Sequence, residues 1–368
     1  MLIGLTFDLA AAWAAEGLAA EDLAEFDAPE TIAAVEQFLA ARGHRVARIG
    51  RALDLVARLA RGERWDLVFN ICEGRSGAGR EALVPALLDA YAIPYTFGDP
   101  LTLALALDKA LAKRVLRDAG LPTAPFAVLG PGCNAAPANL PFPLFVKPVA
   151  EGTGKGIDAA SLCHDAVELA AATDRLTRRF NQSVLAESWL PGREFTVGVL
   201  GAGERARILG VMEIFSAATY GFDTKKHYQG RVAYRLAGDA EAAAAGEAGL
   251  GAWRAIGGRD AGRIDLKSDT AGRPMLLEAN PLAGLHPIDS DLVIMARLAG
   301  HGYDWLLDQI FTAACRRANL PWTSRSRHRR IGERRPAAVV AHAPLRADRQ
   351  LRSRRAEPGT EPSARMPS

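Results

Sequence analysis

The sequence predicts an α/β (α+β) fold, and two patterns support this prediction. Over roughly the first hundred residues, short apolar segments alternate with segments of helical periodicity, which is typical of a parallel sheet covered by helices on both faces. Near residue 270, alternating runs at 262–267 and 275–280 flank the polar stretch 268–272, which predicts an antiparallel hairpin. The length of 368 residues and the 49% apolar content allow two or three core-forming units.

The first part of the chain supplies the strands of the predicted parallel sheet. These strands are expected at 2–6, 46–49, 65–70 and 93–98, the last closing the unit. Between the first two, a helix begins near Pro29, which suits a first helical turn, and stops at Gly43. A second helix is expected at 53–60.

The rest of the chain is also predicted to mix strands and helices. Asp99 precedes Pro100 at the start of one helix, and Asp108 caps a second helix at 109–119 that Gly120 ends. Further strands are expected at 142–148, 184–190, 193–199 and 208–215, and further helices at 240–256, 292–299 and 305–318.

The formal net charge of +3 is unevenly distributed along the chain. Residues 325–368 carry 12 Arg and 4 acidic residues, a net charge of +8, so the residues before them carry −5. From Pro321 onward the chain loses its periodicity, which predicts a disordered basic tail. Such a tail could attract nucleic acid or anionic lipid, or be simply solvated. The mildly acidic folded part is not expected to bind nucleic acid.

Several features point to a cytoplasmic protein without a membrane partner. No apolar run is long enough to cross a bilayer, and residues 1–6 resemble a first strand more than a signal peptide. The four cysteines lie far apart and form no Cys-x-x-Cys pair, so neither a zinc site nor a disulfide framework is indicated. A reducing compartment suits such free thiols.

The predicted hairpin would gather polar side chains on one face. Because strand side chains alternate, Arg263 and Asp265 share one face of the first strand, and Glu278 and Asn280 share one face of the second. The residues expected to point the other way are Ile264, Leu266, Leu277 and Ala279. Oxygen ligands suit Mg²⁺, and an arginine beside the metal suits charge on a transferring phosphoryl group. The alternative is a polar face that is only solvated.

A glycine-containing loop at 151–157 follows the predicted strand that carries Lys147. Its spacing is not that of a Walker A loop, and it does not open a helix as a Rossmann fingerprint does. Alone it indicates an ordinary turn. In this setting, however, its glycines would let backbone amides approach phosphate oxygens while the lysine neutralises their charge.

Three other segments are candidates for ligand contacts. The loop 72–80 follows a predicted parallel strand, at the sheet edge where such folds bind ligands. The turn at Pro191 lies between Glu187 and Glu194, where backbone groups and carboxylates could hold a nucleoside. The segment 216–229 is rich in aromatic and cationic residues, which fits a closing lid. The respective alternatives are a flexible connection, an ordinary hairpin and a solvated loop.

Taken together, these motifs resemble the D-alanine–D-alanine ligase family of the ATP-grasp superfamily over residues 1–318. The motifs follow the order and approximate spacing of that family: Asp66-Leu67-Val68-Phe69-Asn70, Ile93-Pro94-Tyr95-Thr96, Leu107-Asp108-Lys109, Val146-Lys147-Pro148, Glu151-Gly152-Thr153-Gly154, Glu187-Ser188-Trp189-Leu190, Gly192-Arg193-Glu194-Phe195-Thr196-Val197, Gly262-Arg263-Ile264-Asp265 and Leu277-Glu278-Ala279-Asn280.

The resemblance implies a Rossmann-like (pre-ATP-grasp) substrate domain at 1–98, followed by a two-part ATP-grasp fold. Its central subdomain would span 99–185, and its C-terminal subdomain, with the metal site, 186–320; the basic tail at 321–368 would remain disordered. ATP would bind between the two ATP-grasp sheets. The implied ATP-binding residues are, for phosphates, Lys109, Lys147, Thr153 and Lys225, and, for the nucleoside, Glu187, Trp189, Leu190 and Glu194.

The resemblance also implies catalytic and metal-binding roles for the hairpin. Asp265, Glu278 and Asn280 would bind two Mg²⁺ ions, with Mn²⁺ as an alternative. Arg263 would stabilise the transferring phosphoryl group and a later tetrahedral intermediate. The backbone amide of Gly284 would lie in the oxyanion hole.

Departures from the family pattern fall on the amino-acid side of the site. Glu73-Gly74 stands where members have His-Gly, Thr153-Gly154 stands where serines are usual, and Ala283 replaces a frequent proline. The usual N-terminal Glu-Val-Ser is missing, which leaves Glu25 as the candidate for holding the ammonium of the first substrate. Ser290 lies where the family binds the carboxylate of the second.

The implied reaction joins two amino acids through an acyl phosphate, with D-alanyl-D-alanine for peptidoglycan precursors of the cell wall as the first choice of product. A homodimer is expected, with small-molecule amino acids as substrates. One alternative is an ATP-grasp carboxylate–amine ligase that acts on other amino acids or peptides. The other is a nucleotide-binding protein that has lost ligation.

Overall fold

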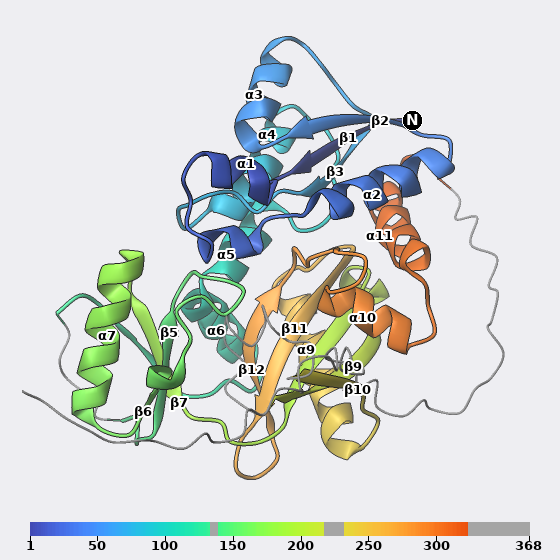
Figure 1. Cartoon of the computed structure of the whole chain (residues 1–368). Helices are drawn as coiled ribbons and strands as arrows, with labels where there is room; N and C mark the ends of the chain where they lie inside the picture. The colour runs from blue at the N-terminus through green and yellow to red at the C-terminus, as the bar shows by residue number, and fades with distance from the viewer. Residues whose placement is uncertain (133–138, 217–231, 323–368) are drawn as a thin grey trace, which may run out of the picture.

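The computed structural model describes residues 1–132, 139–216 and 232–322, which form three β-sheets (Figure 1). A parallel sheet comes first, with strand order β2-β1-β3. An antiparallel four-stranded sheet has the order β4-β7-β5-β6, and an antiparallel five-stranded sheet has the order β10-β9-β8-β11-β12. Within the described part of the chain, no helix is long and apolar enough to cross a bilayer.

The parallel sheet confirms three of the four strands predicted for this region. These strands are β1 (Leu2–Phe7), β2 (Arg45–Gly50) and β3 (Leu67–Ile71). The fourth prediction, at 93–98, was wrong: that segment forms only one bridge, between Tyr95 and Val68. The physical reason lies at Phe97, whose φ of 69° turns the chain and whose N–H donates to Asp260 Oδ2 at 2.7 Å.

Helices cover both faces of this sheet. They are α1 (Ala10–Ala15), α2 (Pro29–Ala41), α3 (Ala52–Ala60) and α4 (Leu83–Ala90), with 3₁₀ turns η1 (Asp22–Glu25) and η2 (Arg80–Ala82). Ile3 and Leu5 of β1 point into a core shared with α2. The intervening Gly4 faces the other side, where a Cβ atom would meet Ile49 at 2.5 Å. This close packing requires glycine there.

The four-stranded sheet is covered by α7 on one face. Its strands are β4 (Phe126–Leu129), β5 (Leu144–Pro148), β6 (Leu162–Cys163) and β7 (Val184–Ser188), and the covering helix is α7 (Ala166–Phe180), preceded by the 3₁₀ turn η3 (Ala159–Ser161). Helix α6 (Lys109–Asp118) packs through Ala110 against Leu185 of β7, and helix α5 (Pro100–Leu107) contacts α6 and β12 (Pro274–Asn280). Val146 and Ala186 pack against Leu176 of α7. Because side chains alternate, Lys147 and Glu187 face away from α7.

The five-stranded sheet contains the predicted hairpin. Its strands are β8 (Glu194–Leu200), β9 (Arg207–Ser216), β10 (Val232–Leu236), β11 (Ala261–Ser268) and β12 (Pro274–Asn280), with the 3₁₀ turn η4 (Gly203–Arg205) before β9. Helix α9 (Ala240–Ala255) packs against Val197 and Ile264 on one face. Helix α10 (Asp291–Leu298) covers the other face, where Met295 approaches Gly198.

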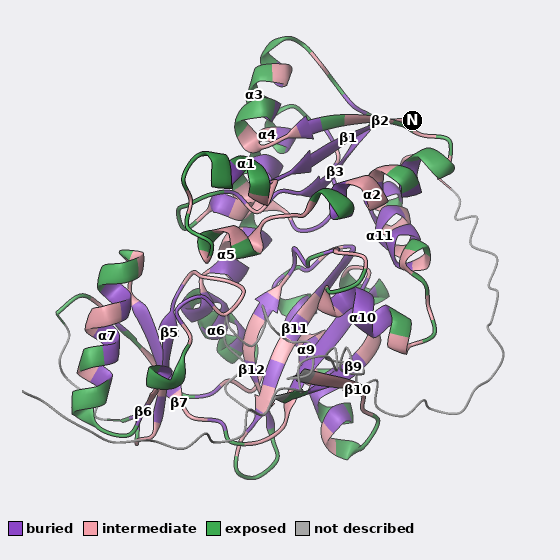
Figure 2. Cartoon of the chain, viewed as in Figure 1, coloured by how far each residue is buried: buried purple, intermediate pink, exposed green. Residues whose placement is uncertain are grey.

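The last helix, α11 (Tyr303–Arg317), returns to the N-terminal part of the chain and lies beside α2 (Figure 1). Phe311 of α11 and Phe38 of α2 belong to one core cluster, with ring centroids 6.5 Å apart. Figure 2 shows buried residues concentrated on the strands and on the helix faces turned toward them. The first elements and the last described helix therefore share a core, and Leu282, Ala283 and Leu285 of this core reach the candidate site between the sheets.

Candidate active site

Two adjoining cavities lie between the sheets and share a wall. The first is bordered by β5 and β7 of the four-stranded sheet and by β8, β11 and β12 of the five-stranded sheet. The second extends from β12 toward the loops that follow β1 and β3. The residues common to both linings are Lys109, Glu151, Arg263 and Glu278. A ligand in one cavity can therefore meet a ligand in the other at this wall.

The hairpin of β11 and β12 supplies much of the shared wall. Asp265 pairs directly with Glu278, and Arg263 pairs with Asn280, so all four side chains rise from neighbouring positions. Ile264 on the opposite face is fully buried against α9. The predicted convergence of polar groups on one sheet face is therefore found.

One residue of the predicted hairpin core is misplaced. A β-bulge shifts the register after Asp265, so that Leu266 pairs with Leu276 rather than Leu277. Leu276 is fully buried, whereas Leu277 lines the first cavity. The extra residue therefore turns Leu277 toward ligand space, on the side that Glu278 already faces, as bulges commonly do beside active sites.

Asp265 is the centre of a hydrogen-bond network. It accepts hydrogen bonds from Arg263 Nη1 at 2.8 Å, from Asn280 Nδ2 at 3.2 Å and from Thr196 Oγ1 at 2.9 Å. Arg263 Nη1 also donates to Asp291 Oδ2 at 3.0 Å. Because the amide nitrogen of Asn280 is engaged, its oxygen is left as the group available to a ligand.

The donor set of this wall fits Mg²⁺. Two carboxylates and one amide oxygen are hard ligands, and Mg²⁺ completes its coordination with water and substrate phosphates. Among the residues that the structure describes, no three His, Cys, Asp or Glu side chains form a metal-binding group.

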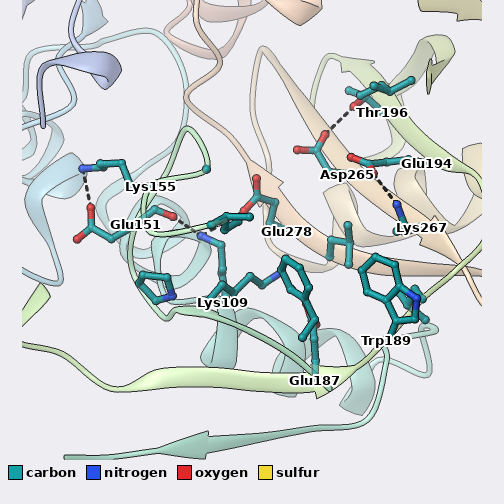
Figure 3. A pocket seen from close by; sticks show the side chains of 18 of the residues that line it. Lys109, Glu151, Lys155, Glu187, Trp189, Glu194, Thr196, Asp265, Lys267 and Glu278 are labelled. Carbon is teal, nitrogen blue, oxygen red and sulfur yellow. Dashed lines mark hydrogen bonds and ion pairs between the residues drawn. The ribbon is translucent and has the colours of Figure 1, made fainter. Parts of the chain in front are cut away.

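Lys109 connects α6 to the wall shared by the two cavities. The helix begins after Asp108, whose side chain accepts from the amides of Ala110 and Leu111. Lys109 Nζ lies 3.2 Å from Glu278 Oε2 and donates to the carbonyl oxygen of Glu151 at 2.5 Å (Figure 3). The ammonium group is thus held between the hairpin and the glycine loop.

Glu187, at the end of β7, is held between two lysines. Its Oε1 lies 2.7 Å from Lys147 Nζ, and its Oε2 lies 2.9 Å from Lys113 Nζ. Burial by itself would raise the pKa of Glu187, but the two ammonium groups outweigh burial and lower the pKa to about 2. Lys113 also donates to the carbonyl oxygen of Leu276 on β12 at 2.7 Å. This network joins the two sheets that face the first cavity.

The far end of the first cavity is aromatic. The ring centroids of Trp189 and Phe145 lie 5.7 Å apart, and the backbone N–H of Trp189 donates to the carbonyl oxygen of Pro143. Beside this ring, 5.6 Å from its centroid, lies Lys267 Nζ, which pairs with Glu194 Oε2 at 2.8 Å (Figure 3). The first cavity has a volume of 110 Å³, below the roughly 300–1,000 Å³ of typical ligand pockets. A nucleotide would therefore require side chains such as Lys267 to move aside.

The glycine loop contributes to both cavities. Thr153 and Gly154 both have positive φ, 53° and 73°, which turns the backbone sharply. Gly154 lines the first cavity, whereas Thr153 lines the second. Lys155 approaches Glu151 at 2.5 Å and Glu25 at 3.1 Å. Thr153 therefore lies at the second cavity and Gly154 and Lys155 at the first, and the phosphate contact of Thr153 stays a prediction.

The second cavity contains the residues predicted to handle amino acids. Gly284 and Ser290 line it, and Ser290 Oγ accepts a hydrogen bond from the amide of His286 at 2.8 Å. Glu25 lines it too, but its carboxylate already accepts hydrogen bonds from the Gly152 amide at 2.7 Å and from Arg80 at 3.2 Å. The cavity volume is 430 Å³, within the usual range for a small ligand.

One predicted site residue is not described by the structure, and several residues near the two cavities were not predicted. Lys225 lies outside the described residues. The residues that sequence reasoning missed are Arg80, Lys113, Lys155, Thr196, Lys267 and Asp291. A signal existed for two of them: Lys113 follows Lys109 by one helical turn, and Lys267 continues the alternation of Arg263 and Asp265.

Comparison with known proteins supports the motif assignment. Residues 115–312 match the family model described as D-ala D-ala ligase C-terminus, which is more than half of the chain. A D-alanine–D-alanine ligase from Stutzerimonas stutzeri is 36% identical over 282 residues, which covers 75% of this chain and 85% of the relative. One from Bordetella petrii is 34% identical over 264 residues, covering 70% and 78% respectively. An uncharacterized protein of Sinorhizobium fredii is 31% identical over 263 residues, covering 68% and 75%.

Solved structures show the same fold. The D-alanine–D-alanine ligase of Bacillus anthracis complexed with ATP superposes with a TM-score of 0.66 at 21% identity, covering 87% of this chain and 99% of that one. A D-Ala:D-Ser ligase of Enterococcus faecalis gives a TM-score of 0.66 at 20% identity, covering 85% and 99%. The fold is thus of the ATP-grasp type. Because the sequence relatives pass 30% identity over more than two thirds of the chain, this protein belongs to the D-alanine–D-alanine ligase family.

Proposed function

We propose that this protein is an ATP-dependent, ADP-forming ligase that joins two amino acids through an acyl phosphate, with D-alanine as the preferred substrate for both positions. One observation carries the proposal. The wall shared by the two cavities holds Arg263, Lys109 and Glu278, beside Asp265 and Asn280. A nucleotide in the first cavity would meet a carboxylate in the second at this wall.

The first cavity suits a nucleoside triphosphate. Trp189 and Leu190 offer backbone groups and apolar surface for a base, and Glu194 offers a carboxylate for ribose hydroxyls. Lys109 and Lys147 supply positive charge where the phosphates would lie. Both lysines are nearly buried, which strengthens their interaction with phosphate because water is largely excluded.

The shared wall suits phosphoryl transfer to a carboxylate. When bound at Asp265, Glu278 and Asn280, Mg²⁺ would neutralise phosphate charge. Arg263 is fixed by Asp265 and Asp291, so its guanidinium is oriented before any substrate binds. A preorganised cation of this kind stabilises developing negative charge without reorganisation. The backbone amide of Gly284, at the second cavity, would stabilise the oxyanion formed when an amine attacks the acyl phosphate.

The choice of D-alanine rests on the relatives, several of which are D-alanine–D-alanine ligases. A ligase for other amino acids or peptides is the second candidate. It is favoured by the second cavity, whose lining includes Glu73 and Glu81 near the place where the family pattern has histidine. A nucleotide-binding protein without ligation is disfavoured by the intact hairpin set.

We also propose the organisation in which the enzyme acts. The proposed boundary between the N-terminal domain and the central subdomain lies between residues 98 and 99, and the proposed basic tail begins at residue 321, both as predicted from the sequence. The second boundary is moved from 185 to the turn at 189–193, because β7 pairs with β4 and β5 through Ser188. A cytoplasmic homodimer is the proposed assembly, in keeping with a biosynthetic ligase.

Incubation of the purified full-length protein with ATP, Mg²⁺ and a panel of D- and L-amino acids tests the proposal. The expected result is release of ADP and phosphate together with a dipeptide mass, with D-alanyl-D-alanine most abundant. A different dipeptide would favour the second candidate. ATP binding without turnover on any amino acid would contradict ligation.

A further inference from the structure

A third cavity lies apart from the two that form the candidate active site. Its volume is 260 Å³, and it is bordered by the end of β8, by η4, by the start of β9 and by the C-terminal half of α11. None of the described residues that line it also lines the first or the second cavity. A ligand bound here would therefore be separate from the substrates of the shared wall.

The described lining of this cavity contains four arginines and one carboxylate. Arg205 belongs to η4, Arg207 begins β9, and Arg316 and Arg317 end α11, whereas the carboxylate is that of Asp260. Cations are favourable in the last turn of a helix, which accounts for the two arginines of α11. The helix dipole does not account for Arg205 and Arg207, which come from other elements. The fold thus gathers positive charge around one hollow.

The single carboxylate neutralises only one of the four arginines. Asp260 is 1% exposed, and its Oδ2 accepts hydrogen bonds from Arg317 Nη2 and from the Phe97 amide, both at 2.7 Å. The same Arg317 nitrogen donates to the carbonyl oxygen of Tyr95 at 2.8 Å. The other three arginines of the cavity form no ion pair with any residue that the structure describes. Their mutual repulsion would be relieved by a bound anion.

The neutral polar side chains of the cavity also offer donors. Gln309 Oε1 accepts from Arg207 Nη2 at 2.6 Å, which leaves the amide N–H groups of Gln309 for a ligand. Thr312 Oγ1 accepts from the indole N–H of Trp322 at 3.1 Å, which leaves the hydroxyl hydrogen of Thr312 to donate. Arg317 Nε is buried and has no acceptor among the described residues. A ligand rich in acceptor oxygens fits this lining, whereas an amine or a metal cation does not.

The chemistry of the lining favours a phosphate monoester over a carboxylate. A guanidinium group presents a planar pair of donors that matches two oxygens of either anion. A phosphate monoester carries about −1.5 to −2 charges at pH 7 and three acceptor oxygens, so it can contact several arginines at once. One carboxylate brings a single charge and two oxygens. The volume of 260 Å³ lies just below the roughly 300–1,000 Å³ of drug-sized pockets, which limits the ligand to a small molecule.

We propose that the third cavity binds a small phosphate monoester through Arg205, Arg207 and Arg316. This inference goes beyond the proposed ligase function and does not depend on it. The place of the cavity in the fold gives the ligand a route to the candidate active site. Asp260, which lines the cavity, immediately precedes β11, the strand that carries Arg263. A ligand in the third cavity would therefore lie against the start of that strand.

Calorimetric titration of the full-length protein with glycerol phosphate tests this site. The double variant Arg205→Gln/Arg316→Gln is compared with Arg45→Gln/Arg114→Gln, which removes two exposed arginines that lie elsewhere and form no ion pair with the described residues. Both double variants have the same net charge, so non-specific attraction of the anion is matched. We expect Kd to rise on the order of a hundredfold in the first double variant and to stay near the wild-type value in the second, because a hydrogen bond to a charged group contributes on the order of tenfold.

The outcomes decide both the place of the site and the class of its ligand. Equal affinity in the two double variants would overturn the proposal, because the phosphate would then bind elsewhere on the protein. The absence of saturable binding by the wild type would also overturn it. Succinate, titrated at the same ionic strength, is the comparison for ligand class. Tighter binding of succinate than of glycerol phosphate would overturn the assignment to phosphate.

Hydrogen–deuterium exchange with and without glycerol phosphate locates the bound anion. Protection is expected at residues 201–207 and 309–317, which border the third cavity. Protection confined to residues 146–155 would place the phosphate in the first cavity and overturn the proposal. None of these measurements needs turnover, so a failure of the proposed ligation would not change their meaning.

Discussion

Lys113 Nζ lies 2.9 Å from Glu187 Oε2 and donates to the backbone carbonyl of Leu276 at 2.7 Å. This one ammonium group, 1% exposed, therefore ties the end of β7 to β12 across the gap between two sheets. Because Glu187 also binds Lys147, the network orders both walls of the first cavity. Its removal should affect stability and nucleotide binding together.

Lys113→Met tests the structural part of this relationship. The variant leaves the Leu276 carbonyl without its donor and Glu187 with a single lysine in a buried setting. Breaking a buried pair in this way costs about 3–5 kcal/mol of unfolding free energy. Urea unfolding measures the change, and Lys267→Met, which removes a partly exposed lysine of β11, serves as the control. A loss below about 1 kcal/mol would show that this network contributes little.

Glu278→Gln tests the proposed role of Glu278 in metal binding at the wall shared by the two cavities. The substitution preserves shape but removes the charge that faces Lys109 and the proposed Mg²⁺. Turnover should fall at least about 100-fold with little change in the thermal midpoint, because the charge is needed mainly when phosphate is transferred. Steady-state ADP release measures the effect, and Asp265→Asn should behave similarly. Wild-type turnover in folded Glu278→Gln would remove this residue from the metal site.

Glu194 is expected to accept hydrogen bonds from the ribose hydroxyls of ATP. Its carboxylate pairs with Lys267 at 2.8 Å on the wall of the first cavity. If it accepts from the sugar hydroxyls, wild-type enzyme should prefer ATP over 2′-deoxy-ATP or 3′-deoxy-ATP on the order of tenfold, and Glu194→Gln should lose most of that preference. Competition between the nucleotides in ADP release measures it. An equal preference in both proteins would place the ribose elsewhere.

The depressed pKa of Glu187 predicts acid sensitivity. Because its pKa is about 2 in the folded protein and about 4.3 in an unfolded chain, the folded state binds fewer protons between these values. Its stabilisation, up to about 3 kcal/mol, is therefore present above pH ~4.3 and lost as the pH falls toward 2. Unfolding free energies of wild type and Glu187→Gln should converge over this window. A constant difference between pH 5 and 2.5 would contradict the assignment.

Glu81 should contribute the opposite dependence. Its pKa is raised to about 7, so the folded state binds more protons than the unfolded chain between pH ~4.3 and 7. Stability should fall as the pH rises through this window, and Glu81→Gln should remove part of the fall. Chemical unfolding at pH 5 and pH 7 measures both proteins. An equal pH dependence in the two would contradict the raised pKa.

Much of the fold was predictable because its signals are local. Pro29 and Gly43 correctly bracket α2, and Asp99 and Asp108 correctly mark the starts of α5 and α6. Helix α7 was missed although it carries comparable signals: Asp165 caps it, and its buried residues repeat at helical spacing. The short β6 carries almost no signal, since its two residues pair only with β5.

The sequence by itself determined the polar face of the hairpin, because strand alternation and a turn are sufficient to bring Arg263, Asp265, Glu278 and Asn280 together. Only the tertiary structure decided what surrounds it. The bulge that exposes Leu277 is set by how β11 and β12 pair. The partners of Glu25, such as the Gly152 amide, come from segments far away in the chain. Such contacts depend on how the sheets pack against each other, and no local periodicity encodes that packing.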